Sequence, residues 1–123
     1  MPGQFSATSD LPHVTVATIQ LVVGDFYGLT RDQLLSRCAR RQVSAPRQIA
    51  MYLAKHLTRQ SYPNLGRRFG DRDHTTVLHA VRKVASLRQS DPRVALHLDA
   101  LTSELTTPAA DAFRVGGRKR DFQ

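Results

Sequence analysis

Residues 67–83, RRFGDRDHTTVLHAVRK, constrain the fold of this chain more than any other segment. Gly70 permits a tight bend. Asp73 is placed to cap the helix that follows, because its carboxylate can accept from the free N–H groups of a first helical turn. Apolar residues then recur with the spacing of one buried helical face: Leu78, Val81 and Ala85, flanked by Val77 and Val84. The segment is therefore predicted to be the turn and second helix of a helix-turn-helix.

The other face of this predicted helix carries hydrogen-bonding side chains in its first turn and cations further along, namely His74, Thr75, Thr76, His79, Arg82 and Lys83. A helix that lies in a DNA major groove reads base edges near its N-terminus, and neighbouring side chains contact phosphates. The distribution of side chains therefore indicates a helix that recognises double-stranded DNA.

The positive charge of the chain is concentrated in one region. The formal net charge is +8, and residues 31–93 hold 14 of the 18 Lys and Arg residues but only four acids. A concentrated basic field implies a polyanionic partner. Cys38 is the only cysteine, so no intrachain disulfide can form, and the reducing cytoplasm is the expected compartment. A DNA-binding protein would associate with the nucleoid there.

Capping residues and apolar periodicity predict two helices near the N-terminus. The first starts near Thr15 and ends at Gly28, where a helix C-terminus favours a residue that tolerates positive φ. The second opens at Thr30, with Gln33 placed to complete a capping box.

A third helix is expected to start at residues 44–46, with Pro46 in its first turn, where a missing N–H has no hydrogen bond to lose. Arg47 and Gln48 would then stand at a helix N-terminus and face outward, where free N–H groups also attract phosphate. The basic residues 37–41 ahead of this helix are interpreted as a connector that could lie against a phosphate backbone or in a minor groove.

The helix-turn-helix is expected over about residues 61–88. Its first helix is short, with Ser61 as the cap and with Leu65 and Phe69 pointing inward. A last helix starts at residues 90–92 and carries an apolar stripe: Val94, Leu98, Leu101 and Leu105. We expect this helix to pack back on the bundle of a monomer, and a dimer through residues 91–106 is the alternative.

These segments predict a single all-α domain of five to six helices over residues 14–107. Residues 1–13 are interpreted as a flexible leader without the features of a signal peptide, and residues 108–123 as a disordered basic tail. No apolar run is long enough to span a bilayer, so a membrane partner is not expected.

Two segments carry a resemblance to a known family: APRQIAMYLAK at residues 45–55 and RDHTTVLHA at residues 72–80. With these segments and the spacing between them, the stretch from about residue 19 to residue 83 resembles the C-terminal DNA-binding domain of the bacterial chromosomal replication initiator DnaA. The resemblance implies an all-helical, Trp-repressor-like fold with an embedded helix-turn-helix. It also implies sequence-specific binding to initiator boxes at replication origins and some promoters.

The resemblance further implies roles for individual residues. The start of the recognition helix would read bases through Asp73, His74, Thr75, Thr76 and Val77. The DNA backbone would be contacted by Arg47, Gln48, Lys55, Tyr62, Pro63, His79 and Lys83. Ala39 occupies a position where the family commonly has a minor-groove arginine, so Arg40 or Arg41 would serve as the minor-groove arm. Asp71 replaces a glycine that the family usually has, and this adds a carboxylate beside the DNA face.

Full initiators of this family carry an ATPase module, and the present sequence has neither the length nor the phosphate-binding loop for one. We therefore expect a stand-alone DNA-binding domain that competes with the initiator or regulates transcription, without enzymatic activity, cofactor or small-molecule substrate. A segment of a longer protein is the alternative. No metal site is expected either. His74 and His79 are five residues apart and would lie on different faces of the helix, unlike paired metal ligands.

Two other functions stay open on the sequence alone. A protein–protein adaptor could bind replication-initiation proteins through the last helix. Such a protein, however, needs neither the HTT segment at 74–76 nor the concentration of basic residues in one region. A non-specific electrostatic DNA binder could have lost box specificity through Ala39 and Asp71. RNA binding is less favoured, because the aromatic residues lie in apolar stripes and not at exposed positions suited to stacking.

Overall fold

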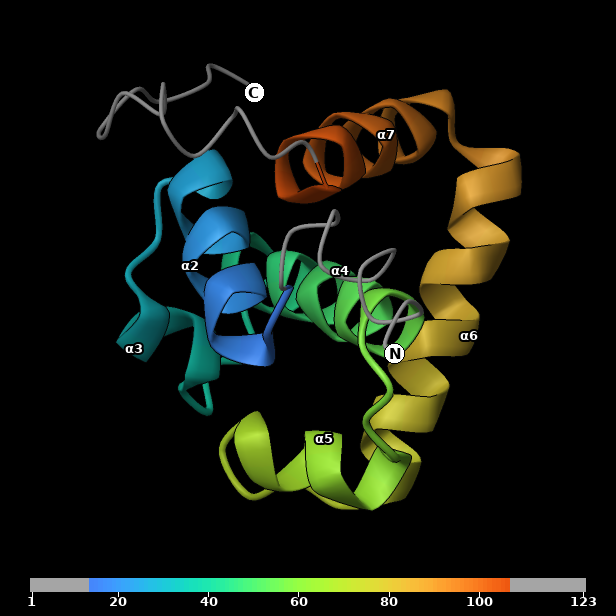
Figure 1. The fold of residues 1–123 in the computed structure, drawn as a ribbon. Coiled ribbons are helices and arrows are strands. Elements are labelled where there is room, and N and C mark those ends of the chain that lie inside the picture. The colour runs from blue at the N-terminus through green and yellow to red at the C-terminus, as the bar shows by residue number, and fades with distance from the viewer. Residues whose placement is uncertain (1–13, 107–123) are drawn as a thin grey trace, which may run out of the picture.

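A computed structural model describes residues 14–106, and within that range the chain forms six α-helices and no strand (Figure 1). The helices are α2 (Val16–Tyr27), α3 (Arg31–Leu35), α4 (Arg41–Leu57), α5 (Tyr62–Arg68), α6 (His74–Ser90) and α7 (Pro92–Thr106). The prediction of an all-α bundle of five to six helices with a helix-turn-helix is confirmed. The predicted leader at 1–13 and tail at 108–123 lie outside the described residues.

Side-chain hydrogen bonds set the starts of α2 and α3. The N–H of Thr18 donates to Thr15 Oγ1 at the first turn of α2. Thr30 and Gln33 form the predicted capping box, with hydrogen bonds of 2.8 and 3.0 Å. Gly28 ends α2 in the left-handed region, at φ 75°. These starts, and the glycine at the end of α2, are confirmed.

The start of α4 differs from the prediction of a first turn at residues 44–46. The helix begins at Arg41, and Pro46 lies inside it. The N–H groups of Val43 and Ser44 both donate to the carbonyl oxygen of Arg40, so a full turn forms ahead of the proline. Proline at this point removes only the N–H that would donate to Gln42, an exposed residue, so water can replace the lost partner.

The helix α5 and the turn after it follow the predicted pattern. Ser61 caps α5 by accepting from the N–H of Asn64, and both Leu65 and Phe69 are fully buried. The helix-turn-helix therefore has the apolar anchor that the sequence predicts on its first helix.

The turn between α5 and α6 requires positive φ at two residues and a close backbone contact at a third. Gly70 and Asp71 both lie in the left-handed region, at φ 86° and φ 56°. Glycine adopts this conformation freely, and aspartate tolerates it better than most side chains do. A Cβ atom on Gly66 would stand 2.1 Å from the carbonyl oxygen of Arg72, so only a glycine fits where α5 meets the turn.

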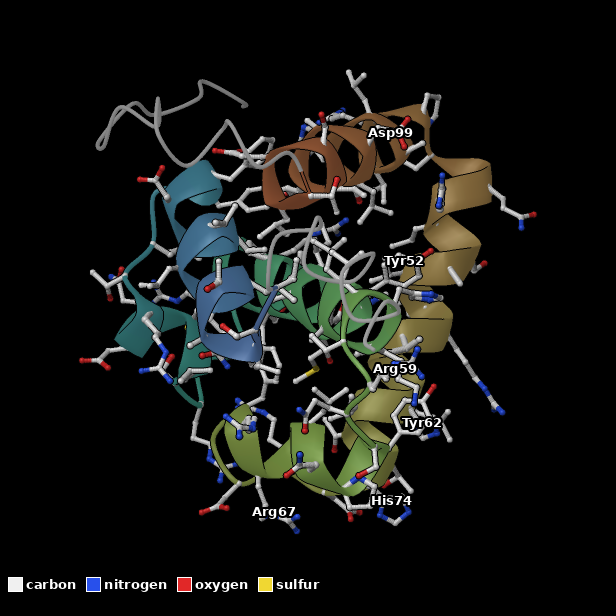
Figure 2. All side chains as sticks on the ribbon, viewed as in Figure 1. Tyr52, Arg59, Tyr62, Arg67, His74 and Asp99 are labelled. Atoms are coloured by element: carbon white, nitrogen blue, oxygen red, sulfur yellow. The ribbon has the colours of Figure 1, made fainter. Side chains whose placement is uncertain are left out.

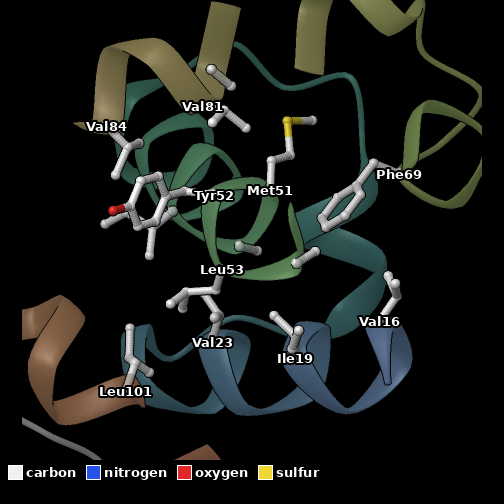
Figure 3. Packing of buried hydrophobic residues seen from close by; sticks show 14 of the residues in the cluster. Val16, Ile19, Val23, Met51, Tyr52, Leu53, Phe69, Val81, Val84 and Leu101 are labelled. Carbon is white, nitrogen blue, oxygen red and sulfur yellow. The ribbon is translucent and has the colours of Figure 1, made fainter. Parts of the chain in front are cut away.

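An apolar core lies among α2, α4, α6 and α7 (Figure 3). Ile19 and Val23 on α2 point toward the face of α4 that carries Leu53, and Leu101 of α7 closes the same region. The apolar periodicity predicted for this helix is confirmed, because Ile19, Val22, Val23 and Phe26 are buried and Tyr27 is half-buried.

The buried face of α6 is turned slightly from the predicted one. Its buried residues are Val77, Ala80, Val81 and Val84, whereas Leu78 and Ala85 are only half-buried. The prediction placed Leu78 at the centre of the stripe, whereas the buried face carries Ala80, a small residue that allows helices to approach closely.

The last helix packs back on the bundle, as predicted. Leu98, Leu101 and Leu105 are buried, and Val94 is half-buried against the core. The apolar stripe of α7 therefore packs against the other helices of the same chain.

Candidate nucleic-acid interface

The first turn of α6 is exposed at the end of the molecule formed by α5 and α6 (Figure 2). His74 and Thr76 are exposed there. In Figure 2, Arg67 and Tyr62 of α5 lie at the same end as His74, while Asp99 of α7 lies at the opposite end. The N–H groups that begin a helix have no intrahelical partner and favour anions. This end of the molecule therefore suits a polyanion.

Asp73 is the N-cap residue of α6, but its carboxylate does not cap a backbone N–H, and that prediction is wrong. Asp73 Oδ2 instead accepts from Thr75 Oγ1 at 2.7 Å, and Oδ1 lies 3.4 Å from His74 Nδ1. The hydroxyl of Thr75 holds the pKa of Asp73 below its ordinary value. The three side chains form a polar group at the start of α6, in which the exposed carboxylate of Asp73 can accept from a base amino group.

Val77 does not belong to this group. Its side chain is fully buried in the core, because it lies on the inward face of α6. The expected base contact by Val77 is therefore wrong. Thr75 is half-buried, which leaves His74 and Thr76 as the most exposed of the predicted base-reading residues that follow the cap.

A surface groove of about 250 Å³ runs between α4 and α6. It is lined by Arg47, Gln48, Met51, Arg72, Thr76, His79, Ala80 and Lys83. Thr76, His79 and Lys83 are exposed along it, and Gln48 is half-buried. The groove therefore joins the first turn of the recognition helix to polar and basic side chains on both helices.

Lys55 and Tyr62 contact each other where α4 ends and α5 begins. Lys55 Nζ lies 4.4 Å from the centroid of the Tyr62 ring and 3.4 Å from the carbonyl oxygen of Gln60. The ring and the carbonyl hold the ammonium group in place. Pro63, in the first turn of α5, is exposed. These predicted backbone-contacting residues thus lie together at the start of α5.

Arg47 is buried, so the prediction that it faces outward from a helix N-terminus is wrong. Only 7% of the residue is exposed. Its Nε atom donates to the carbonyl of Leu34, and its Nη2 atom donates to those of Ser36 and Cys38, each at 2.8 Å. Burial lowers the pKa of this guanidinium. Because α4 starts at Arg41, both Arg47 and Gln48 also lie beyond the first turn of that helix.

Arg40 and Arg41 do not form an extended arm. Arg40 is the N-cap residue of α4, without a side-chain hydrogen bond to the helix, and Arg41 is the first helical residue. Both are exposed. The irregular part of the basic connector is therefore residues 36–40, and the two arginines stand at its end.

Arg72 has a structural role that the sequence did not predict. It precedes the cap of α6, and its Nη2 atom donates to the carbonyl of Ser36 at 2.7 Å. Its Nη1 atom donates to the carbonyls of Leu35 and Phe69. Burial is the first cause that lowers its pKa, followed by the charges of Arg47 and Arg37. No residue pattern marks these acceptors, because every residue has a carbonyl group.

The described residues contain no helix with the length and hydropathy of a membrane span. Residues 14–106 also bring together no group of three or more His, Cys, Asp or Glu side chains that could hold a metal ion.

A family model matches the part of the chain that contains the exposed start of α6, the basic groove and the helix-turn-helix. The model of the bacterial DnaA protein helix-turn-helix matches residues 16–84, from the start of α2 into α6. The chain belongs to this family. Its fold is accordingly the DNA-binding helix-turn-helix domain of the DnaA type.

Several curated relatives can be aligned with most of the chain. The chromosomal replication initiator protein DnaA of Caulobacter sp. (strain K31) is 48% identical over 92 residues, which cover 75% of this chain and 19% of that protein. The protein of the same name from Brucella abortus biovar 1 is 42% identical over 108 residues, which cover 88% and 22%. That of Rhizobium meliloti is 49% identical over 88 residues, which cover 72% and 18%. The chain thus spans about a fifth of the length of these relatives.

Proposed function

We propose that this chain binds double-stranded DNA sequence-specifically at sites of the initiator-box type. The observation that carries the proposal is the exposed start of α6, where His74 and Thr76 lie next to the carboxylate of Asp73, which accepts from the hydroxyl of Thr75. Side chains in this position reach base edges when such a helix enters a major groove. Asp73, His74, Thr75 and Thr76 are the proposed base readers.

The groove between α4 and α6 supports the second half of the proposal, which concerns the DNA backbone. Gln48, His79 and Lys83 line it next to Thr76. Contacts of this kind with phosphates position a protein on the duplex, whereas base contacts set the sequence preference. We assign Gln48, His79, Lys83 and the cluster of Lys55, Tyr62 and Pro63 to the backbone, and Arg40 or Arg41 to the minor groove.

In the cell, such a chain would occupy initiator boxes in the cytoplasm, on the nucleoid. Its role there would be in the regulation of replication initiation or of transcription. The names of the relatives, which are chromosomal replication initiators, support this role. The intramolecular burial of the α7 stripe supports a monomer.

The test is fluorescence anisotropy with a duplex that holds one initiator box and with a scrambled duplex, across a salt series. We expect the box to be preferred about 100-fold. Thr76→Ala should remove most of the preference, because it deletes a base-reading side chain. Lys83→Ala should weaken both duplexes alike and lower the salt slope by about one.

Two results would contradict the proposal. Equal binding of both duplexes with a steep salt dependence would show a non-specific electrostatic DNA binder. Absence of binding to both duplexes would favour an adaptor that contacts replication-initiation proteins.

A further inference from the structure

The connector between α3 and α4, residues 36–40, is held by arginine side chains from two other elements. We propose, on the basis of the DNA binding proposed above, that Arg47 and Arg72 are positioning residues. In this role they form a clamp that fixes the connector against α6, so that Arg41 and the recognition helix meet DNA as one rigid unit.

The carbonyl oxygen of Ser36 is the centre of this clamp. It accepts from Arg47 Nη2 at 2.8 Å and from Arg72 Nη2 at 2.7 Å. Arg47 comes from α4, whereas Arg72 comes from the turn that leads into α6. A single backbone oxygen of the connector therefore accepts hydrogen bonds from both α4 and the helix-turn-helix.

Further hydrogen bonds fix the segments on both sides of Ser36. Arg47 also reaches the carbonyls of Leu34 and Cys38, and Arg72 reaches that of Leu35. In the opposite direction, Arg37 Nη2 of the connector donates to the carbonyl of Gly70 at 3.1 Å. The connector and the turn before α6 thus hold each other through donors from both sides.

The acceptors of the clamp explain why it contains arginine. Leu34, Leu35 and Ser36 are at the C-terminal end of α3, where carbonyl groups have no intrahelical partner. A guanidinium can satisfy several of them at once in a fixed planar geometry, which a lysine ammonium cannot reproduce. Within residues 14–106 neither arginine forms an ion pair, so backbone carbonyl groups are the partners of both.

An ordered connector has a direct consequence for binding. Arg41 directly follows the connector and is the first residue of α4, so it lies at the junction that the clamp holds. Order that exists before binding does not have to be created during binding, and affinity is higher for that reason. The contribution of Arg41 to DNA affinity should therefore depend on the clamp.

A double-mutant cycle tests this dependence. Arg41→Ala should weaken binding to the box duplex about fivefold in the natural chain, through the loss of one charged contact. In the Arg72→Lys background, which keeps the net charge, the same substitution should weaken binding less than about twofold. The matched control is Arg88→Lys, an exposed residue at the far end of α6, where Arg41→Ala should keep its full effect. An equal effect of Arg41→Ala in all three backgrounds would overturn the proposal.

The lone thiol provides a second test that needs no DNA. Cys38 lies in the connector, is half-buried, and its carbonyl accepts from Arg47. If the clamp orders the connector, Arg47→Lys and Arg72→Lys should each raise the rate of Cys38 labelling by a thiol reagent about tenfold in the folded protein. Arg88→Lys should leave the rate unchanged, and urea unfolding establishes that each variant is folded. An unchanged rate in both clamp variants would refute the clamp, whereas loss of box preference alone would refute only the proposed function.

Discussion

The side-chain amide of Gln20 donates to the carbonyl oxygen of Arg68 at 2.9 Å, across 48 residues of sequence. Gln20 is fully buried, and its Oε1 atom accepts from Arg31 Nε at 2.7 Å. One buried amide thereby joins α2 to the end of α5 and to the start of α3. A polar residue in the core thus holds the first helix of the helix-turn-helix to the scaffold.

Replacement of this amide should destabilise the protein. Gln20→Leu introduces an apolar side chain of similar size and leaves the carbonyl of Arg68 without its buried donor, so we expect a loss of about 2 kcal/mol in the free energy of unfolding. Urea denaturation measures it. The matched control is Gln89→Leu on the exposed face of α6, which should stay within about 0.5 kcal/mol of the natural chain. Equal losses in the two variants would contradict this role of Gln20.

Gly66→Ala should disrupt the contact between α5 and the turn before α6. The added Cβ atom would lie 2.1 Å from the carbonyl oxygen of Arg72, and a backbone atom cannot move aside cheaply. We expect a loss of about 3 kcal/mol in unfolding free energy, measured by thermal or urea unfolding. DNA affinity should fall as well, because the turn positions α6. Ser86→Ala, on the exposed side of α6, serves as the control and should have little effect.

The stability of the fold should depend on His97 at mildly acidic pH. Burial lowers the pKa of His97, the charge of Arg93 lowers it further, and Asp91 opposes the change. The unfolded state therefore binds the proton more readily. The contribution of neutral His97 to the free energy of unfolding is fully present above the ordinary pKa of about 6.5 and decreases as the pH falls below it. Urea denaturation between pH 7.5 and pH 5 should show this decline. His97→Gln should remove much of it, and the exposed His79→Gln should not.

The ion pair between Arg88 and Asp99 should contribute little. The two groups lie 3.5 Å apart, and 49% and 69% of their side chains are exposed. Exposed pairs are screened by water and salt. Asp99→Ala should therefore change the unfolding free energy by less than about 0.5 kcal/mol. A change well above this value, abolished by high salt, would show that the pair joins α6 to α7 more strongly than its exposure suggests.

The sequence predicted the local features of the fold because these depend on neighbouring residues. The caps at Thr15, Thr30 and Ser61 and the glycine at the end of α2 all follow from side chains within one turn of the atoms that they satisfy. The apolar stripes of α2 and α7 were equally readable from their spacing.

The errors concern positions where two arrangements fit the same residues. Pro46 is compatible with a first turn and also with a helix whose exposed start can lose one hydrogen bond, and the structure has the second arrangement. The carboxylate of Asp73 could accept either from backbone N–H groups or from a neighbouring hydroxyl, and in the structure it accepts from the hydroxyl of Thr75.

The arginine assignments failed for a different reason. Arg47 belongs to a motif of a DNA-binding family, and its charge favoured an exposed position. Its acceptors are carbonyl groups between residues 34 and 38, brought close only by the tertiary fold. Backbone acceptors have no sequence signature, so neither this burial nor the clamp with Arg72 could be predicted.

The position of α7 bears on how this domain can be divided. The family match ends at residue 84, yet Leu98, Leu101 and Leu105 lie beyond it and fill the same core as α2 and α4. A recombinant fragment that stops at the family boundary would leave apolar surface of α2 and α4 in water, and aggregation would be its expected fate. The smallest unit that folds is therefore larger than the segment that carries the recognition signature.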